Sequence, residues 1–493
     1  PPHGLPVTGD DELVVLSPGG GLEVRAGDVI VVRCKGPPGL KGTFDIRGLA
    51  RRAPMAERRR PVAGVYEGHY IVQPDDKGEG LKVSCSLKRG FFSGLKTEAK
   101  AKVTILDPTR SRTAEIVEKY AVLKSATGGY TLFLSSGVKL EVVGRRGGRY
   151  RVRLSEHEDG WIGRGSVRLL PEGTPPPRAE VGLITNIKVS SESVKILIDA
   201  GEKLPFEVRH TIEPLEFQIR FFGASHHFDR VRYPTDGPVV KEVTWRQESS
   251  RVVRVDLETH LQWGWGYHAD YDDNGHFVIE IRRPPDLRTT RNVLAGRKVI
   301  VDAGHGPWKS AVGPLGNTER DVVLEMSFAL EEKLLAEGAD VYMMRTSSDG
   351  PPLLDRNFIA WEERGDFLIS MHLNAFSVRT DPFDKPRGFM HFYYQPHSRP
   401  LATFVHRAYL KRHPELADEF VRYGNLYVCR LTEMPSILTE SGYIILPDQE
   451  RLFVNPKYRE RIADTIVSGL RSYLEQYQKV QAKSWFERRA AAE

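Results

Sequence analysis

Two histidines in the C-terminal part of the chain stand where an imidazole could bind a metal ion. His305 lies in Val301–Gly306 (VDAGHG), where an apolar run ends between two glycines. His372 lies in Ser370–Ala375 (SMHLNA), at the end of another apolar run. Glycine on both sides of His305 lets the chain turn sharply and leaves the imidazole uncrowded. We therefore treat His305 and His372 as candidate ligands of one site.

Two glutamates complete the set of residues that could do chemistry. Glu319 opens a helical run, and Glu440 ends the last apolar run of the chain. Two neutral imidazoles and one carboxylate are the ligands of an open catalytic zinc site, which keeps its fourth position for water. A second carboxylate beside the metal can accept the proton of that water. Taken singly, Glu319 is also explained as an acid at a helix N-terminus and Glu440 as a solvated acid at a strand end.

The elements around these four residues alternate between strand-like and helical runs from Lys298 onward. This alternation predicts an α/β domain with a twisted, mostly parallel sheet flanked by helices. In open sheets of this kind, sites lie beyond the carboxyl ends of the strands, so both histidines should face one crevice. The predicted strands are Lys298–Asp302, Ala339–Arg345, Phe367–His372, Gly388–Tyr394 and Ser436–Glu440.

The region from about 297 to 477 resembles the catalytic domain of zinc-dependent N-acetylmuramoyl-L-alanine amidases of the amidase-3 type. The motifs that carry the resemblance follow the family's order and are Asp302–Gly306, Glu319, Ser370–Ala375 and Glu440–Tyr443. The resemblance implies that His305, Glu319 and His372 hold Zn²⁺ and that Glu440 is the catalytic acid/base. It also implies hydrolysis of the amide that joins N-acetylmuramic acid to L-alanine in the peptidoglycan stem.

The chain departs from the family pattern in two places. Pro307–Ser310 (PWKS) follows Gly306 where the family continues Gly-x-Asp-x-Gly-Ala, and Ala360-Trp361 replaces an Ala-Asn pair. Neither change removes a ligand. Two alternatives stay open: a zinc peptidase that cuts within the stem peptide, and a non-catalytic cell-wall-binding or scaffolding protein with a decayed amidase domain.

Three all-β domains are predicted ahead of the catalytic domain, which we place at 296–478. Short Val-, Ile- and Tyr-rich runs separated by Gly/Pro clusters predict an immunoglobulin-like β-sandwich over 1–110. Residues 111–170 resemble an SH3-like β-barrel. Residues 179–286 resemble an AMIN domain, a β-sandwich that holds cell-wall amidases to peptidoglycan. Trp245, Trp263 and Trp265 in that region could stack on sugars, although aromatic side chains on strands more often pack in a core.

Cys34 and Cys85 lie 51 residues apart in two predicted strands of the first domain. Their spacing resembles that of the bridge between the two sheets of immunoglobulin-like domains. A disulfide in an oxidising compartment and a pair of buried thiols are both compatible with this pattern.

Composition limits the class of protein. The 493 residues contain 71 Lys and Arg against 65 Asp and Glu, a net charge of +6, which favours anionic partners. The most basic stretch lies in the second β-domain and consists of Arg145, Arg146, Arg149, Arg151 and Arg153. No apolar run approaches the ~18–20 residues of a membrane span, and three cysteines exclude a disulfide-rich scaffold.

These observations predict where the protein acts and on what. We expect peptidoglycan as the partner and not nucleic acid, with an envelope activator protein as a further candidate partner. We expect an extracytoplasmic location, periplasmic or cell-wall associated, with a signal peptide removed before Pro1.

Overall fold

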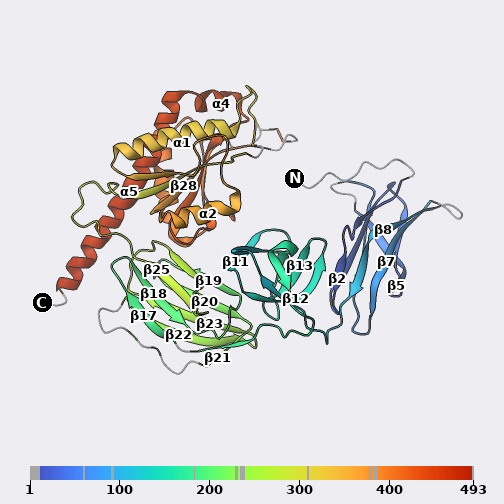
Figure 1. Ribbon diagram of the computed structural model, residues 1–493. Coiled ribbons are helices and arrows are strands. Elements are labelled where there is room, and N and C mark those ends of the chain that lie inside the picture. The colour runs from blue at the N-terminus through green and yellow to red at the C-terminus, as the bar shows by residue number, and fades with distance from the viewer. Residues whose placement is uncertain are drawn as a thin grey trace.

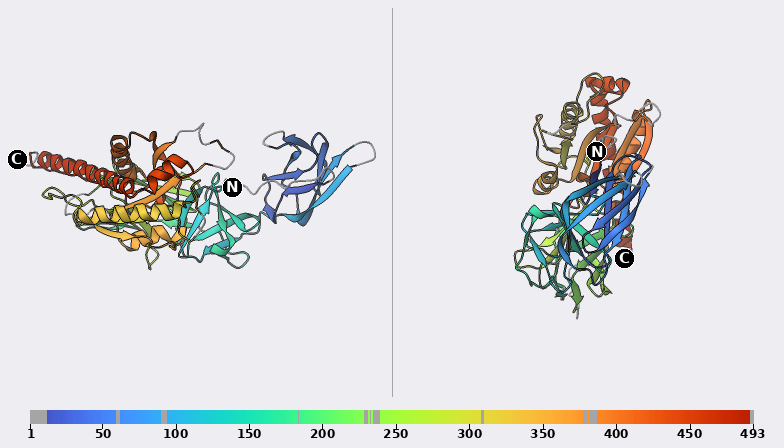
Figure 2. Two further views of the ribbon diagram at one scale, coloured as in Figure 1. Left: turned by 90° about the horizontal axis from the view of Figure 1, so that it is seen from above. Right: turned by 90° about the vertical axis from the view of Figure 1, so that its right-hand side faces the viewer.

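The computed structural model describes residues 12–490, except 59–61, 90–93, 183, 228–230, 232, 234–238, 308–309, 377–379 and 382–386. Three β-domains and one α/β domain follow one another along the chain (Figure 1). The first β-domain lies at one end of the molecule and the C-terminal helix at the other (Figure 2). Among the described residues, no helix combines the length and apolar character needed to cross a membrane.

The first β-domain consists of mostly antiparallel strands, with β2 and β8 as a parallel pair, around a core that includes Phe44 and Tyr66, both fully buried. Its strands alternate buried and exposed positions, as expected for a sheet with one face in a core. They are β1 (Val14–Ser17), β2 (Leu22–Val24), β3 (Val29–Lys35), β4 (Lys41–Ile46), β5 (Ala50–Arg58), β6 (Val65–Ile71), β7 (Gly78–Lys88) and β8 (Gly94–Ile105).

The two cysteines of this domain are neighbours in its core. Cys34 on β3 and Cys85 on β7 are both buried free thiols in the structure. A hydrogen bond to Cys34, together with burial, raises the pKa of the Cys85 thiol. The fold therefore brings the two sulfur atoms together, but it contains no disulfide, and the bridge stays a prediction.

The second β-domain is an antiparallel sheet in the order β15-β9-β12-β13-β14-β10-β11. Its strand β12 also pairs with β2, so one hydrogen-bond ladder crosses the boundary between the first two β-domains. The strands are β9 (Thr113–Ile116), β10 (Tyr120–Lys124), β11 (Tyr130–Ser135), β12 (Lys139–Arg146), β13 (Arg149–Arg153), β14 (Asp159–Gly163) and β15 (Val167–Leu169).

The basic stretch of the second β-domain stabilises this boundary. Arg145 lies 2.7 Å from Glu23, and Arg151 lies 2.8 Å from Asp28. All four side chains are at least two-thirds buried, so these pairs are screened less than exposed ones. Arg145 and Arg151 are therefore each paired with an acid of the first β-domain and do not form an open basic surface.

The third β-domain is a sandwich of two four-stranded antiparallel sheets, β17-β18-β25-β24 and β19-β20-β23-β22. Strands β16 and β21 form a separate parallel pair at its edge. The strands are β16 (Ala179–Val181), β17 (Ile184–Val189), β18 (Ser193–Ile198), β19 (Phe206–His210), β20 (Glu216–Phe222), β21 (Ala224–His226), β22 (Val240–Ser249), β23 (Val252–Thr259), β24 (Tyr267–Tyr271) and β25 (Phe277–Arg282).

Two of the three tryptophans of this region pack against the C-terminal domain. The indole N–H of Trp263 donates to the Tyr473 hydroxyl at 2.7 Å. Trp265 is 1% exposed and lies edge-on to Phe367 of the central sheet. Trp245 packs against the sandwich core. Packing, and not an exposed platform for sugars, therefore explains Trp263 and Trp265.

The α/β domain contains a six-stranded sheet in the order β27-β26-β28-β31-β29-β30. All of its pairings are parallel except that of β29 with β31, so the predicted mostly parallel sheet is confirmed. The strands are β26 (Lys298–Ala303), β27 (Asp340–Met343), β28 (Phe367–Asn374), β29 (Gly388–Tyr393), β30 (Ala417–Tyr423) and β31 (Ser436–Tyr443).

Helices cover both faces of this sheet. Side chains of α1, α3 and α5 pack on the face that carries Val299 and Ile369, while α2 packs on the face that carries Ile300 and Leu368. Successive residues of a strand point to opposite faces, which is why these apolar strands are buried on both sides. The helices are α1 (Glu319–Ala336), α2 (Leu353–Glu362), α3 (Arg399–Arg412), α4 (Pro447–Phe453) and α5 (Pro456–Ala490).

A pair of buried histidines at the contact between the third β-domain and the α/β domain predicts a pH-dependent stability. His397 Nδ1 lies 2.9 Å from His210 Nε2, and burial lowers the pKa of His397 to about 4. In the unfolded chain the pKa of histidine is near 6.5, so below about pH 6.5 the unfolded state binds more protons. The free energy of unfolding should therefore decrease as the pH falls from about 6.5 to 4.

Replacing this histidine should flatten that pH dependence. We expect His397→Gln to reduce the loss of stability between pH 6.5 and 4 by up to about 3 kcal/mol, measured by urea unfolding at several pH values. His157→Gln, at an exposed position, is the matched control and should leave the slope unchanged. Equal slopes in all three proteins would contradict the prediction.

Candidate active site

The predicted site residues meet at the carboxyl ends of three neighbouring parallel strands. Strands β26 and β28 are in register from Val299 to Ala303, and His305 follows two residues after β26 ends. On the other side of β28, His372 is directly opposite Glu440 of β31. Glu319 is the first residue of α1. The two histidines and the two glutamates therefore lie toward the same end of the sheet.

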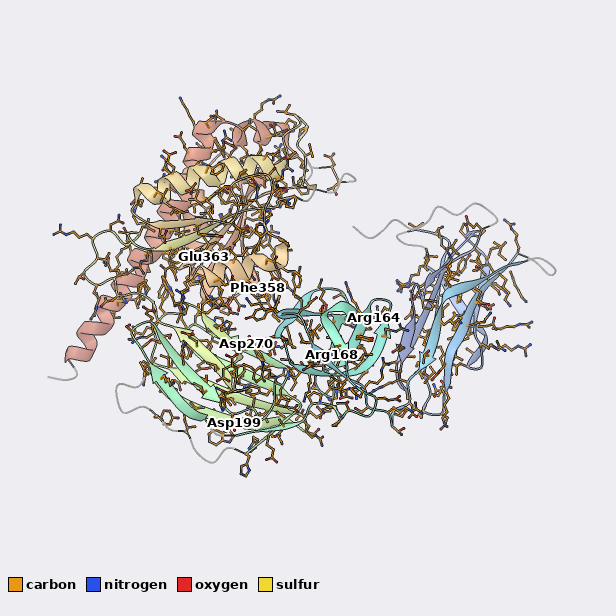
Figure 3. The ribbon with its side chains drawn as sticks, viewed as in Figure 1. Arg164, Arg168, Asp199, Asp270, Phe358 and Glu363 are labelled. Atoms are coloured by element: carbon orange, nitrogen blue, oxygen red, sulfur yellow. The ribbon has the colours of Figure 1, made fainter. Side chains whose placement is uncertain are left out.

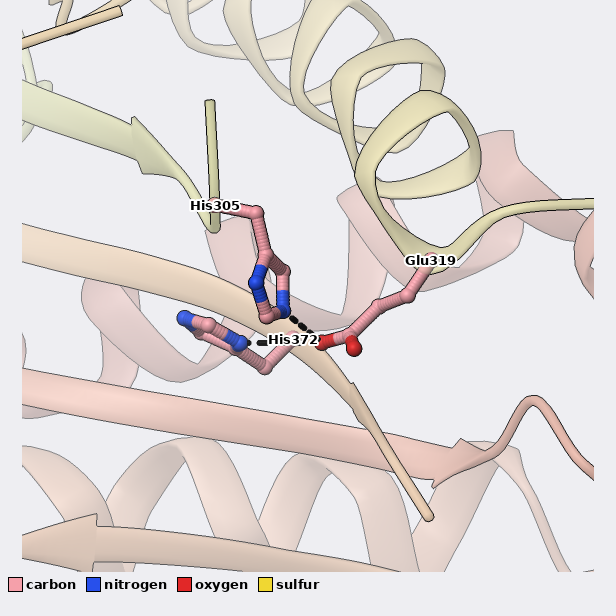
Figure 4. A group of neighbouring side chains, drawn as sticks. All are labelled: His305, Glu319 and His372. Atoms are coloured by element: carbon pink, nitrogen blue, oxygen red, sulfur yellow. Dashed lines mark hydrogen bonds and ion pairs between the residues drawn. The ribbon is translucent and has the colours of Figure 1, made fainter. Parts of the chain in front are cut away.

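Both imidazoles point at the same carboxylate oxygen (Figure 4). Glu319 Oε1 lies 2.8 Å from His305 Nε2 and 3.0 Å from His372 Nδ1. The two rings are 4.9 Å apart, and one ligand atom from each of the three residues falls within 4.8 Å of the others. Two imidazole nitrogens and one carboxylate oxygen at this spacing can hold a divalent cation such as zinc.

The two glutamates differ sharply in their electrostatic environment. Burial by itself raises the pKa of Glu319, but hydrogen bonds from His305 and His372 outweigh it and lower this pKa to about 2. Burial raises the pKa of Glu440 well above its usual value, and the negative charge of Glu319 raises it further. Glu440 Oε2 is buried and has no hydrogen-bond partner among the described residues. Glu319 is therefore a stable anion, whereas Glu440 has one carboxyl oxygen without a hydrogen-bond partner among the described residues.

A buried ion pair supports the turn that carries His305. Arg356 of α2 pairs with Asp302 at the end of β26 and also donates to the carbonyl oxygen of His305. The second oxygen of Asp302 accepts from the Ser370 hydroxyl at 2.7 Å. Because Asp302 and Arg356 are at most 4% exposed, losing either would leave the other charge buried and unpaired, which is strongly destabilising.

A second buried arginine holds the same turn from the other side. The Arg345 guanidinium donates to the carbonyl oxygens of Ala303 at 2.8 Å, Gly304 at 2.7 Å and Arg320 at 2.7 Å. Burial, and then the charge of Arg356, lowers the pKa of Arg345 to about 10. The guanidinium thus links the strand end of β26 to the first turn of α1.

Glu319 is positioned by the loop that precedes it. The fully buried carboxylate of Glu450 accepts from the backbone N–H groups of Leu315 at 2.8 Å and Asn317 at 3.0 Å. Thr318 caps α1 by accepting from the backbone N–H of Asp321 at 3.2 Å. The direction of the Glu319 side chain therefore depends on contacts made more than a hundred residues away.

Close packing at Gly304 fixes the approach of His372. A Cβ atom built on Gly304 would lie 2.4 Å from two ring atoms of His372, which no side chain could tolerate. His305 adopts φ 67°, a left-handed conformation that is costly outside glycine. Strain of this kind persists only where surrounding contacts enforce it, as the two arginines do here.

The structure assigns roles that the sequence did not. The contacts of Arg345, Arg356 and Glu450 show that these residues support the turn and the loop. Trp361, one of the two departures from the pattern, stacks on His268 of the third β-domain at 4.9 Å. Trp308 and Lys309, within the other departure, lie outside the described residues.

A known family model matches the part of the chain that contains these residues. The family model described as N-acetylmuramoyl-L-alanine amidase matches residues 299–472. The probable cell wall amidase LytH of Staphylococcus aureus is 30% identical over 228 residues, 45% of this chain and 70% of LytH. The uncharacterized protein YqiI of Bacillus subtilis is 30% identical over 186 residues, 37% of this chain and 87% of YqiI. The chain belongs to the N-acetylmuramoyl-L-alanine amidase family.

Solved structures of amidases also resemble a part of the chain. AmiC2 of Nostoc punctiforme is 27% identical, with a TM-score of 0.34, and the alignment covers 37% of this chain and 99% of AmiC2. An amidase of Clostridium difficile 630 is 29% identical, with a TM-score of 0.34 and coverage of 36% and 97%.

If His305, Glu319 and His372 bind Zn²⁺, as the resemblance to the amidase family implies, a methyl group at Gly304 should weaken that binding. We expect Gly304→Ala to push the His372 ring out of place and lower the affinity for Zn²⁺ about 10- to 100-fold, measured by competition with a chromogenic chelator. Gly165→Ala is the control, because nothing lies within 4 Å of the position its Cβ would take. Wild-type affinity in Gly304→Ala would show that His372 does not bind the metal.

Proposed function

We propose that this amidase hydrolyses the amide between N-acetylmuramic acid and the L-alanine of the peptidoglycan stem. The proposal includes a zinc ion held by His305, Glu319 and His372. The observation that carries it is the convergence of two imidazole nitrogens on one buried carboxylate oxygen. The proposed reaction follows from membership of the amidase family, and the proposed zinc site follows from this geometry.

The residues present fit a catalytic zinc ion. Three protein ligands of the His₂Glu type leave one position for water or substrate. The low pKa of Glu319 keeps that ligand ionised at any pH at which zinc enzymes work. Glu440 is paired with His372 in the sheet, and its Oε2 is buried without a hydrogen-bond partner among the described residues, which fits the proposed proton acceptor.

In the proposed hydrolysis, different residues of the chain transfer the proton and hold the site in place. When bound, zinc acts as a Lewis acid and makes water acidic enough to react at neutral pH. In the proposed reaction, Glu440 accepts the proton of the attacking water at Oε2 and passes it to the nitrogen of the leaving L-alanine. A positioned acid/base of this kind contributes about 10²–10⁴-fold to the rate. Asp302 and Arg356 keep the His305 turn in place while the charges shift.

A peptidoglycan substrate places the proposed activity outside the cytoplasm. In this proposal the third β-domain is an AMIN-type module that holds the enzyme to the cell wall. An envelope activator protein stays a prediction, and so does the choice between a periplasmic and a wall-associated location.

Removing the proton acceptor should separate catalysis from metal binding. We expect Glu440→Gln to keep its zinc, since the residue is not a ligand, and to release stem peptides from purified peptidoglycan at least about 10²-fold more slowly. Zinc content is measured by mass spectrometry of the metal and release by chromatography. His305→Ala is the comparison and should lose zinc and activity together. Wild-type activity in Glu440→Gln would exclude the proposed role.

The products distinguish amidase from peptidase activity. Cleavage at the proposed bond leaves peptides with a free L-alanine amine and glycan strands with bare lactyl carboxyl groups. A zinc peptidase acting within the stem would leave the L-alanine attached to the sugar. We expect mass spectrometry of digested peptidoglycan to find free L-alanine N-termini in wild type and none beyond background in His305→Ala.

A further inference from the structure

Helix α2 lies between the central sheet of the α/β domain and the second and third β-domains. It contributes to the wall of a cavity of about 500 Å³ where these three domains meet, a wall that includes Thr131 and Trp361. The buried residues of α2 are Arg356 and Ala360, which face the sheet. Figure 3 labels Phe358, which lies on α2 where the α/β domain approaches the β-domains. The helix therefore contacts the sheet on one side and the β-domains on the other.

By itself, α2 is a weak helix. It has only 10 residues, and the residue at its N-cap, Pro352, makes no capping hydrogen bond with its side chain. Isolated helices shorter than about 12–15 residues are marginal in water, and most of their stability in a protein comes from packing. The position of α2 is therefore set by the groups that pack against it on its two sides.

Two ring stacks attach α2 to the β-domains. Tyr120 of the second β-domain stacks on Phe358, with 4.3 Å between the ring centres and 16° between the planes. His268 of the third β-domain stacks on Trp361 at 4.9 Å and 11°. Glu433 holds the His268 ring in place, with 2.8 Å between Glu433 Oε1 and His268 Nδ1. Because the two rings of each pair cover one another, they form contacts between domains.

A third attachment runs through Tyr427, which lies between α2 and the second β-domain. Its hydroxyl donates to the carbonyl oxygen of Leu354 at 2.6 Å, and its own carbonyl oxygen accepts from the Asn357 side chain at 3.0 Å. The Tyr427 ring is edge-on to Tyr130 and Phe133 of the second β-domain, at 5.7 and 5.6 Å. The first, middle and last parts of α2 are thus all connected to a β-domain, directly or through one ring.

On its other side, α2 supports the turn that carries His305. Arg356 pairs with Asp302 and donates to the carbonyl oxygens of His305 and, at 3.3 Å, Ala303. Phe358 follows Arg356 on the same short helix, so a shift of α2 moves the guanidinium as well. His305 keeps its left-handed φ of 67° only through the contacts around it. The geometry of the turn therefore depends on how α2 is held.

We propose that Phe358 and Trp361 are positioning residues for the hydrolytic site and that the β-domains act on the site through them. The two stacks fix α2, and α2 keeps Arg356 where it holds the His305 turn. The proposal rests on the proposed function, because hydrolysis depends on this turn only if His305 binds the metal. Trp361 stands where the family pattern has Asn, so its stack on His268 is a contact that the pattern does not include.

Hydrogen exchange of the turn tests the proposal without relying on activity or on metal. The backbone N–H of Gly304 donates to the carbonyl oxygen of Met371 at 3.0 Å, so its exchange reports opening of the turn. In the metal-free, full-length protein we expect Tyr120→Leu, which removes one stack, to accelerate exchange of peptides that contain Gly304 about two- to tenfold, measured by mass spectrometry. Tyr120→Phe keeps the ring and should exchange as wild type does.

A second pair of variants and a matched control complete the exchange test. Trp361→Asn should also accelerate exchange about two- to tenfold, and Trp361→Phe, which keeps a ring on His268, should restore most of the wild-type protection. Trp263→Leu is the control, because Trp263 connects the third β-domain to Tyr473 of α5 and not to α2. Wild-type exchange in both Tyr120→Leu and Trp361→Asn, or equal acceleration in Trp263→Leu, would overturn the proposal.

Stem-peptide release measures the effect on the proposed reaction. We expect Tyr120→Leu to lower kcat about two- to tenfold and to change KM less than about twofold, because the stack positions the turn and lies outside the hydrolytic site. Trp263→Leu should keep the wild-type kcat. An unchanged kcat in Tyr120→Leu would overturn the positioning role. If wild type releases no stem peptide, the proposed function fails, but the exchange measurement still decides whether the stacks hold the turn.

Discussion

The buried carboxylate of Glu319 between two imidazoles is the interaction on which the α/β domain depends. A buried carboxylate without partners is costly, and here the rings of His305 and His372 and the backbone N–H of Leu373 supply them. These groups come from two separate segments, the turn after β26 and strand β28, while the carboxylate itself belongs to α1. The carboxylate can be satisfied only if β26, β28 and α1 are all in place, so the fold and the site stabilise each other.

Layers of buried polar contacts extend outward from that carboxylate. Asp302, Arg345 and Arg356 hold the turn behind His305, and Glu450 holds the loop before Glu319. Each of these groups is itself buried and makes at least two hydrogen bonds. A site supported in this way loses little free energy to rearrangement when it binds a metal or a substrate.

The β-domains are fastened to the α/β domain by specific buried contacts and not by a flexible tether alone. Arg282 of β25 donates to the carbonyl oxygens of Gly365 at 2.7 Å and Glu433 at 2.9 Å, and Trp263 bonds to Tyr473 of α5. Contacts of this kind give the junction a defined shape. The cavity between the domains is formed by this packing of one domain against another.

Much of this protein could be predicted from local sequence patterns. Apolar runs that end in Gly-His-Gly or Met-His-Leu-Asn placed His305 and His372 at strand ends, because burial of a parallel strand leaves a local apolar signature. Strand β30 was missed, since its sequence (ADEFVRY) is that of a polar edge strand with one buried residue. The pairing of Arg145 with Glu23 and of Arg151 with Asp28 could not be predicted, because these acids lie more than a hundred residues away.

The sequence by itself determined the family, the order of the domains (β-domains first, then the α/β domain), and the residue types that can bind zinc. Those properties depend on short-range periodicity and on motifs a few residues long. Only the tertiary structure decided that both histidines meet one oxygen of Glu319, that Arg356 and Glu450 support them, and that Thr131 and Trp361 share a cavity. Each of these features depends on contacts between segments that are distant in the chain. Such contacts arise from tertiary packing, which local sequence patterns do not predict.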